Sequence, residues 1–269
     1  MSNAFVVNNG SSTPVETCKT ILGFSNLISS SAIGGVSWPA AYPFLNCFDN
    51  KSNTEWSPVA SSGSMVIEIT QSYISTVNYF GLFSKNASTA GLTVTVEVFN
   101  NNTGAYKTVG TAGSMTNGKP IMFAFDDITS YKQRVTLTWV APLFISAMNV
   151  GYGLDFGRTM SFGAQPAHLA SLDKVEGFTT EGNHFIAGRR ISNGYQMKGQ
   201  INFVSFDIIN ARWPEYMNHV LDSKPVFLMW NTNKTDQVIY GIQNPETLTK
   251  PSYKSNNFGE IQFDINGFA

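Results

Sequence analysis

The first half of the chain alternates short apolar segments with polar turn segments. At residues 92–99, Leu92, Val94 and Val96 alternate with polar neighbours, a period of two that predicts a half-buried strand. The intervening segments are dense in Gly, Asn and Thr, which tolerate tight turns. We therefore predict strands at residues 65–70, 76–83, 92–99, 120–125, 134–139 and 143–151. Many short strands at near-regular spacing indicate a β-sandwich or barrel.

The second half has a different pattern, with one helix among strands. Residues 151–192 contain scattered glycines and are interpreted as a junction with irregular strands, and a strong strand is predicted at residues 195–207. The helix that follows has Pro214 near its first turn, where the missing N–H costs nothing, and ends before Pro225. Its apolar positions at helical spacing are Trp213, Met217, Val220 and Leu221.

The last segments predict a hairpin and a closing strand. Residues 225–230 and 237–242 are apolar segments joined by a polar turn, and residues 259–268 place Ile261, Phe263 and Ile265 on one face. The predicted fold class is therefore mainly β. An N-terminal β-sandwich at residues 1–155, which the resemblance described below implies to be a jelly roll, precedes a smaller β-rich, α+β or split-barrel-like domain with one helix at residues 156–269.

Composition narrows the possible partners. With 269 residues the chain exceeds a typical single domain, and only 13% of its residues are charged, about half of the usual share. The net charge of -1 provides no basic surface for phosphates, so we expect no nucleic-acid partner. The N-terminus has no basic and apolar leader pattern, and the longest apolar stretch is broken by Pro142. We therefore expect neither a secretory signal nor membrane insertion.

Residues with catalytic or metal-binding chemistry are scarce. The three histidines, His168, His184 and His219, have no carboxylate or cysteine at a ligand spacing, and no nucleotide, hydrolase or metalloprotease motif occurs. The adjacent Asp126 and Asp127 are interpreted as turn residues. We therefore predict no enzyme activity and no catalytic, cofactor or metal residues.

The two cysteines leave several alternatives open. Cys18 and Cys47 match no zinc spacing. We expect two reduced, buried cysteines that behave as small hydrophobic residues, with a disulfide or a reactive thiol as the alternatives.

The segment at residues 43–56, PFLNCFDNKSNTEW, admits three interpretations. It could form a metal loop, part of a sugar site, or a corner of a β-sandwich. Aromatic rings can stack on sugar rings, and the first-half candidates are Trp38, Tyr42, Trp56, Tyr106 and Tyr131. The alternative for each is a place in the sandwich core.

Asn46, Asp49, Thr54 and Trp56, with the apolar strands that follow, resemble a pattern of the discoidin class of galactose-binding-like jelly rolls. The resemblance implies a corner-turning Asp loop that in some relatives holds calcium. Calcium prefers six to eight oxygen ligands, and Asp49 is the only acid between residues 43 and 54. We therefore expect Asp49 and Thr54 to satisfy an Asx-type turn and Trp56 to pack under the sandwich, with a calcium ion as the alternative.

The second half resembles domains of phage tail-tube, distal-tail and baseplate proteins in the order of its elements and in the segment from Trp213 to Gly241. The resemblance implies a structural component of a phage tail tip or baseplate, located in the virion. Its expected partners are copies of itself and neighbouring tail proteins, with a host-surface glycan as a further partner. The helix and the hairpin that follows it are the expected inter-subunit surface. The alternative function is a carbohydrate-binding module of a cell-surface-binding protein.

Overall fold

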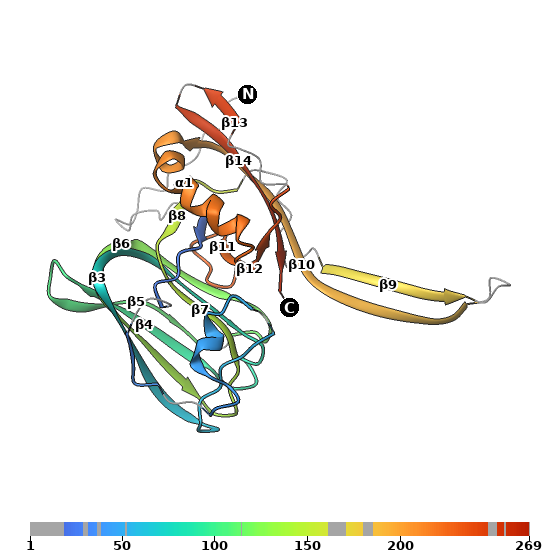
Figure 1. Ribbon diagram of the computed structural model, residues 1–269, viewed down its shortest axis with the longest axis horizontal. Helices are drawn as coiled ribbons and strands as arrows, with labels where there is room; N and C mark the ends of the chain where they lie inside the picture. The colour runs from blue at the N-terminus through green and yellow to red at the C-terminus, as the bar shows by residue number, and fades with distance from the viewer. Residues whose placement is uncertain are drawn as a thin grey trace, which may run out of the picture.

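The computed structural model describes residues 19–28, 32–36, 39–51, 53–113, 115–160, 171–179, 185–246, 252–255 and 257–268. Over these residues the protein is mainly β, with two antiparallel sheets and one α-helix, which confirms the predicted fold class. Figure 1 shows a curled sandwich, a second sheet with the helix beside it, and a two-stranded ribbon that extends away from both.

The sandwich is a six-stranded sheet that folds over itself. Its strands are β2 (Ala32–Gly34), β3 (Gly63–Ser84), β4 (Thr93–Asn100), β5 (Ala105–Ala112), β6 (Ile121–Trp139) and β7 (Ile145–Gly151). They follow the order β2-β3-β6-β4-β5, with β7 also paired to β3. The long strands β3 and β6 pair almost throughout, but register shifts between Thr70 and Ser75 and between Val77 and Tyr79 bend the pair. One half of the pair therefore lies in each layer (Figure 1).

The sandwich core explains the alternation in the sequence. Leu92, Val94 and Val96 are buried, whereas Thr93 between them is exposed, as predicted for a half-buried strand. The other layer contributes Phe80 and Phe123, whose stacked rings have centroids 6.0 Å apart. The inward side chains of both layers form one apolar cluster that includes Ile67, Ile69, Leu82, Ile121, Val135, Leu137, Ile145 and Val150.

Several predicted boundaries in this part were wrong. The predicted strands at 65–70 and 76–83 are both in β3, and those at 120–125 and 134–139 are both in β6. The strands continue across the bend although residues 71–74 have no partner in the ladder between β3 and β6, and Gln71 donates from Nε2 to Oε1 of Gln133 at 3.2 Å inside the protein. Asp126 and Asp127 therefore lie within β6 and not in a turn. Strand β5 was missed, because none of its residues is buried and its sequence lacks apolar alternation.

The second sheet has eight strands drawn from distant parts of the chain. They are β1 (Ile21–Gly23), β8 (Gly153–Asp155), β9 (Ser171–Thr179), β10 (Phe185–Ser205), β11 (Val226–Met229), β12 (Val238–Gln243), β13 (Ser252–Ser255) and β14 (Phe258–Gly267). The order is β8-β1-β11-β12-β14-β10-β9, with β13 beside β14. The predicted hairpin, now β11 and β12, is confirmed. The sheet includes β1 and β8 from before residue 156, and the proposed division at 155 stays a prediction.

The helix α1 (Phe206–Leu221) packs on one face of this sheet. It begins six or more residues earlier than expected, because Ser205 caps it by accepting a hydrogen bond from the Asp207 N–H at 3.3 Å. Pro214 lies inside the helix, so its predicted place in the first turn was wrong. Leu221 is 65% exposed and does not belong to the buried face, which consists of Ile209, Trp213, Tyr216 and Val220.

The other face of the second sheet packs on the sandwich. Phe227 and Tyr240 from the sheet meet Tyr79 and Phe83 from β3 in a separate buried cluster that also contains Ile21, Met122, Ala147, Met229 and Val238. Gly81 provides the space for this contact, since an added Cβ would lie 2.7 Å from the Phe227 ring. The end of β3 and all of β7 are therefore buried on both faces.

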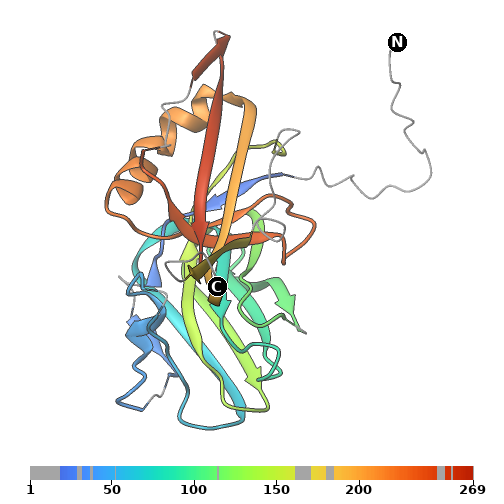
Figure 2. The same ribbon diagram turned by 90° about the vertical axis from the view of Figure 1, so that its right-hand side faces the viewer.

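Strand β9 and the first part of β10 form an arm, defined here as residues 171–179 and 185–194. Strand β10 pairs with β14 only from Tyr195 onward, whereas its earlier residues pair with β9. Figure 1 shows the two strands of the arm running well beyond the sandwich and the second sheet. In Figure 2, turned by 90°, the helix lies along one side of the tall second sheet, above the sandwich.

Candidate functional site

The Asp49 loop has the mechanical role that the sequence predicted. Asp49 accepts a hydrogen bond at Oδ1 from the Lys51 N–H at 2.9 Å and at Oδ2 from the Thr54 hydroxyl at 2.8 Å. Both carboxylate oxygens therefore close an Asx-type turn. Among the described residues, no group of three or more His, Cys, Asp or Glu side chains is arranged to hold a metal ion.

Trp56 and Asn46 hold this loop on the sandwich. Trp56 is fully buried, and its backbone pairs with Ile145 in both directions at 2.8 and 2.9 Å. Its ring meets the Phe44 ring edge-on at a centroid distance of 5.2 Å. Asn46 donates from Nδ2 to the Glu55 carbonyl at 2.8 Å. Trp56 packs in the core as expected, so it cannot stack on a ligand in this conformation.

The other aromatic candidates differ in accessibility. Tyr42 is 40% exposed and Tyr131 is 37% exposed, so each offers part of its ring to solvent. Tyr106 is less available, because the guanidinium of Arg134 lies 4.2 Å from its ring centroid. Trp38 lies outside the described residues. Tyr42 and Tyr131 are therefore the accessible aromatic candidates, and among the described residues their ring contacts are with Phe144 and Phe99, not with Trp56.

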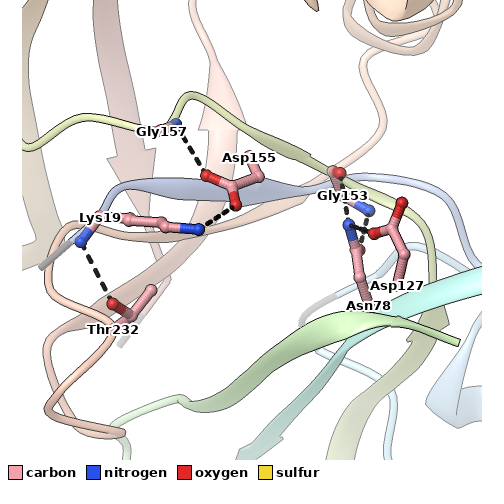
Figure 3. Close-up of polar contacts among 7 residues, drawn as sticks. All are labelled: Lys19, Asn78, Asp127, Gly153, Asp155, Gly157 and Thr232. Atoms are coloured by element: carbon pink, nitrogen blue, oxygen red, sulfur yellow. Dashed lines mark hydrogen bonds and ion pairs between the residues drawn. The ribbon is translucent and has the colours of Figure 1, made fainter. Parts of the chain in front are cut away.

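The sequence did not indicate the polar junction between the sandwich and the second sheet (Figure 3). Asn78 of β3 accepts a hydrogen bond from the Gly153 N–H at 2.7 Å and donates one to the Gly153 carbonyl at 3.1 Å. Its side-chain amide thus pairs with the backbone of β8 as the backbone of a neighbouring strand would. The same amide donates to Asp127 Oδ1 at 3.0 Å. The backbone groups of Gly153 are therefore already paired within the chain.

Lys19 and Asp155 fasten the start of the described chain to the same junction. The Lys19 ammonium lies 3.0 Å from Asp155 Oδ2, and Asp155 Oδ1 accepts from the Gly157 N–H at 2.7 Å (Figure 3). The hydrogen bond to Asp155 and its charge raise the pKa of Lys19. The Lys19 N–H also reaches the Thr232 hydroxyl at 3.2 Å. These residues lie far apart in the sequence, so no local pattern could have indicated the contact.

Of the cysteines and histidines, Cys47 and His219 lie in the described part of the chain, and both are packed inside the protein. Cys47 is a buried free thiol, and burial raises its pKa well above the ordinary value, in agreement with a small hydrophobic residue. Cys18 lies outside the described residues. His219 is packed under Phe24, forms a 2.9 Å hydrogen bond with the Pro225 carbonyl, and has a pKa lowered by burial. His168 and His184 also lie outside the described residues.

Comparisons with known proteins give neighbours in solved structures only, since no family model and no curated protein matches the chain. One neighbour is chitosan-binding module 1 from a chitosanase/glucanase of Paenibacillus sp. IK-5. It is 22% identical with a TM-score of 0.39, over 48% of this chain and 99% of that chain.

Two further neighbours come from Clostridium perfringens. The family 32 carbohydrate-binding module of NanJ, in complex with galactose, is 15% identical with a TM-score of 0.39, over 48% of this chain and 98% of that chain. Module CBM32-1 from a family 31 glycoside hydrolase is 13% identical with a TM-score of 0.40, over 48% and 99%. Similarity at this level assigns no function. No comparison supports the expected phage-tail domain.

Among the described residues, no helix combines the length and the apolar character that a membrane span requires.

Proposed function

We propose that the protein is a structural subunit that assembles with copies of itself through the β9–β10 arm. The observation that carries this proposal is the arm, which pairs with no other element in the described part of the chain. An isolated two-stranded hairpin is at best marginally stable in water. A ribbon of this length therefore gains stability when another surface covers it.

The strands at the two ends of the strand order, β8 and β9, differ in a way that favours the arm as the contact. At the β8 edge, Asn78 occupies the N–H and carbonyl of Gly153. At the other end, β9 pairs with β10 and with no further strand among the described residues, so its outer backbone groups can pair with another chain. A contact between β9 and a different surface of the next copy is heterologous, and such contacts close into rings when the rotation permits.

In this proposal the assembly is a phage tail tip or baseplate within the virion, as the resemblance of the second half implies. Neighbouring copies and other tail proteins are then the partners. The sandwich, which is attached to the second sheet through the Phe227 cluster, would face outward from the ring. The low share of charged residues, 13%, suits a surface that packs against other subunits.

The experiment is a comparison of the purified protein with an arm-deleted variant. Residues 172–194 are replaced by Asn-Gly, a two-residue turn that joins Ser171 to Tyr195, which are aligned in the two strands, and each sample is examined by electron microscopy and mass measurement. We expect rings or other defined oligomers for the full chain and a folded monomer for the variant. A Tyr42→Ala variant serves as the control and should assemble normally. A full chain that stays monomeric at high concentration, or an arm deletion that still assembles, would overturn the proposal.

The second candidate function is carbohydrate binding by the sandwich, favoured by the exposed ring of Tyr42. This ring is held in place by an edge contact with Phe144 at a centroid distance of 5.6 Å, so it presents a fixed apolar surface. Ring faces of this kind suit the apolar side of a sugar. Glycan-array binding that Tyr42→Ala abolishes and Tyr42→Phe retains would support this function. Binding unchanged in Tyr42→Ala would exclude Tyr42 as its basis.

A further inference from the structure

A groove of about 200 Å³ lies where the loop before β6 meets the β11–β12 hairpin. The sandwich contributes Lys119 and Pro120, and the second sheet contributes most of the remaining wall. Tyr42 is not among the described residues that line the groove. Tyr195 of the lining is aligned with Ser171 of β9, so the groove lies at the base of the arm and apart from the Tyr42 surface.

Aromatic side chains form the inner wall of this groove. Tyr240 is buried, and its ring is held between Phe227 at 4.4 Å and Phe268 at 5.3 Å, measured between centroids. Tyr195 and Trp230 are partly exposed along the same groove. Aromatic walls of this kind provide the apolar contacts that dominate small-molecule sites.

Three polar side chains lie beside these rings. The side chains of Lys119, Tyr195 and Asp236 form no hydrogen bond or ion pair with the residues that the structure describes. Together they provide cationic and hydroxyl donors and a carboxylate acceptor. One positive and one negative charge leave the groove without a preference for a charged ligand. A neutral ligand with several hydroxyl groups could use all three side chains.

The walls are fixed by hydrogen bonds in the backbone and between side chains. The Met122 N–H donates to the Thr235 carbonyl at 3.0 Å, which joins the sandwich to the hairpin turn beside the groove. Within the turn, Asn231 donates from Nδ2 to Oε1 of Gln237 at 2.9 Å. A ligand would therefore meet a largely preformed site, which lowers the entropic cost of binding.

We propose that this groove binds one neutral, polyhydroxylated ring, the chemistry of a single sugar residue. The volume supports one ring, since it lies below the roughly 300 to 1,000 Å³ of sites for drug-sized ligands. The apolar face of the ring lies against the aromatic wall, and its hydroxyl groups reach Lys119 and Asp236. The proposal depends neither on assembly through the arm nor on glycan binding at Tyr42.

The test is saturation-transfer NMR of the full chain with galactose, glucose, mannose and N-acetylglucosamine at millimolar concentration. We expect at least one sugar to receive saturation from the protein. Asp236→Ala, at an exposed position, and Trp230→Ala should each raise its Kd about tenfold, the effect of losing roughly one well-placed contact. Circular dichroism confirms that each variant is folded, and if Trp230→Ala unfolds, Asp236→Ala decides the result.

Tyr42→Ala is the matched control, because it removes an exposed aromatic ring outside the groove. It should leave the Kd unchanged. Three results would overturn the proposal: no saturation transfer to any of the four sugars, a Kd that Asp236→Ala does not alter, or a Kd that Tyr42→Ala raises as much as the groove variants do. The last result would place sugar binding at the Tyr42 surface instead.

Discussion

Replacing Gly81 by alanine tests whether the sandwich and the second sheet are packed as closely as the structure indicates. The new Cβ would lie 2.7 Å from the nearest carbon of the Phe227 ring, well inside the ordinary carbon–carbon contact of about 3.5 to 4.0 Å. The ring cannot swing aside easily, because its other neighbour is Tyr240, with centroids 4.4 Å apart. We expect a loss of about 1 to 3 kcal/mol in the free energy of unfolding, as for other overpacked cores.

Urea denaturation followed by circular dichroism measures this loss, and Gly113→Ala is the matched control. At Gly113 an added Cβ would lie 3.7 Å from its nearest neighbour, Thr93 Oγ1, and we expect a change within about 0.5 kcal/mol. The double variant Gly81→Ala with Phe227→Leu should lose less than the sum of the single changes, since the new methyl group fills part of the space that the ring vacates. Equal effects of the two glycine changes, or strict additivity in the double variant, would refute the close packing of the two sheets.

Three further predictions concern single side chains. Asn78→Leu should cost about 1 to 3 kcal/mol, because it leaves the N–H and carbonyl of Gly153 unpaired, and an unchanged midpoint of urea denaturation would contradict the strand-like role of its amide. Burial lowers the pKa of His219 below its ordinary value of 6.5, so the unfolded chain binds more protons as the pH falls through that range. The wild type should therefore lose stability below about pH 6.5 more steeply than His219→Gln, as urea titrations at several pH values would reveal. Asp49→Ala should cost about 1 kcal/mol or more in the free energy of unfolding, since it removes the acceptor of two hydrogen bonds, and millimolar calcium should leave the melting temperature of the wild type unchanged.

Most of strands β3, β4, β6 and β7 could be predicted, because apolar residues occupy their buried positions. Leu92, Val94 and Val96 face the core, and their alternation with exposed neighbours reflects this directly. The Asp49 turn was predictable as well, since Lys51 and Thr54 lie within five residues of Asp49. Short-range sequence patterns of this kind indicate both which residues of a segment are buried and which hydrogen bonds they form.

The stacking of the second sheet on the sandwich could not be predicted from local patterns. The sequence predicts a strand at residues 76–83. It does not indicate that the face with Tyr79 and Phe83 packs against Phe227 instead of facing solvent. The junction through Asn78 and the groove beside Tyr240 also depend on this stacking. Pro214 was misleading because a proline inside a helix is disfavoured, yet the cap at Ser205 and the buried face of α1 override that preference.

The pairing of β1 with β11 has a consequence for how the protein is made. Ile21 is aligned with Met229, so a strand that leaves the ribosome early has to wait until more than 200 further residues have been synthesised. Until then, the sandwich can form while the outer face with Tyr79 and Phe83 remains uncovered. A nascent chain that stalls before residue 226 would therefore expose an aggregation-prone apolar surface and need a chaperone. Completion of the second sheet covers this surface and so lowers the tendency of a newly synthesised chain to aggregate.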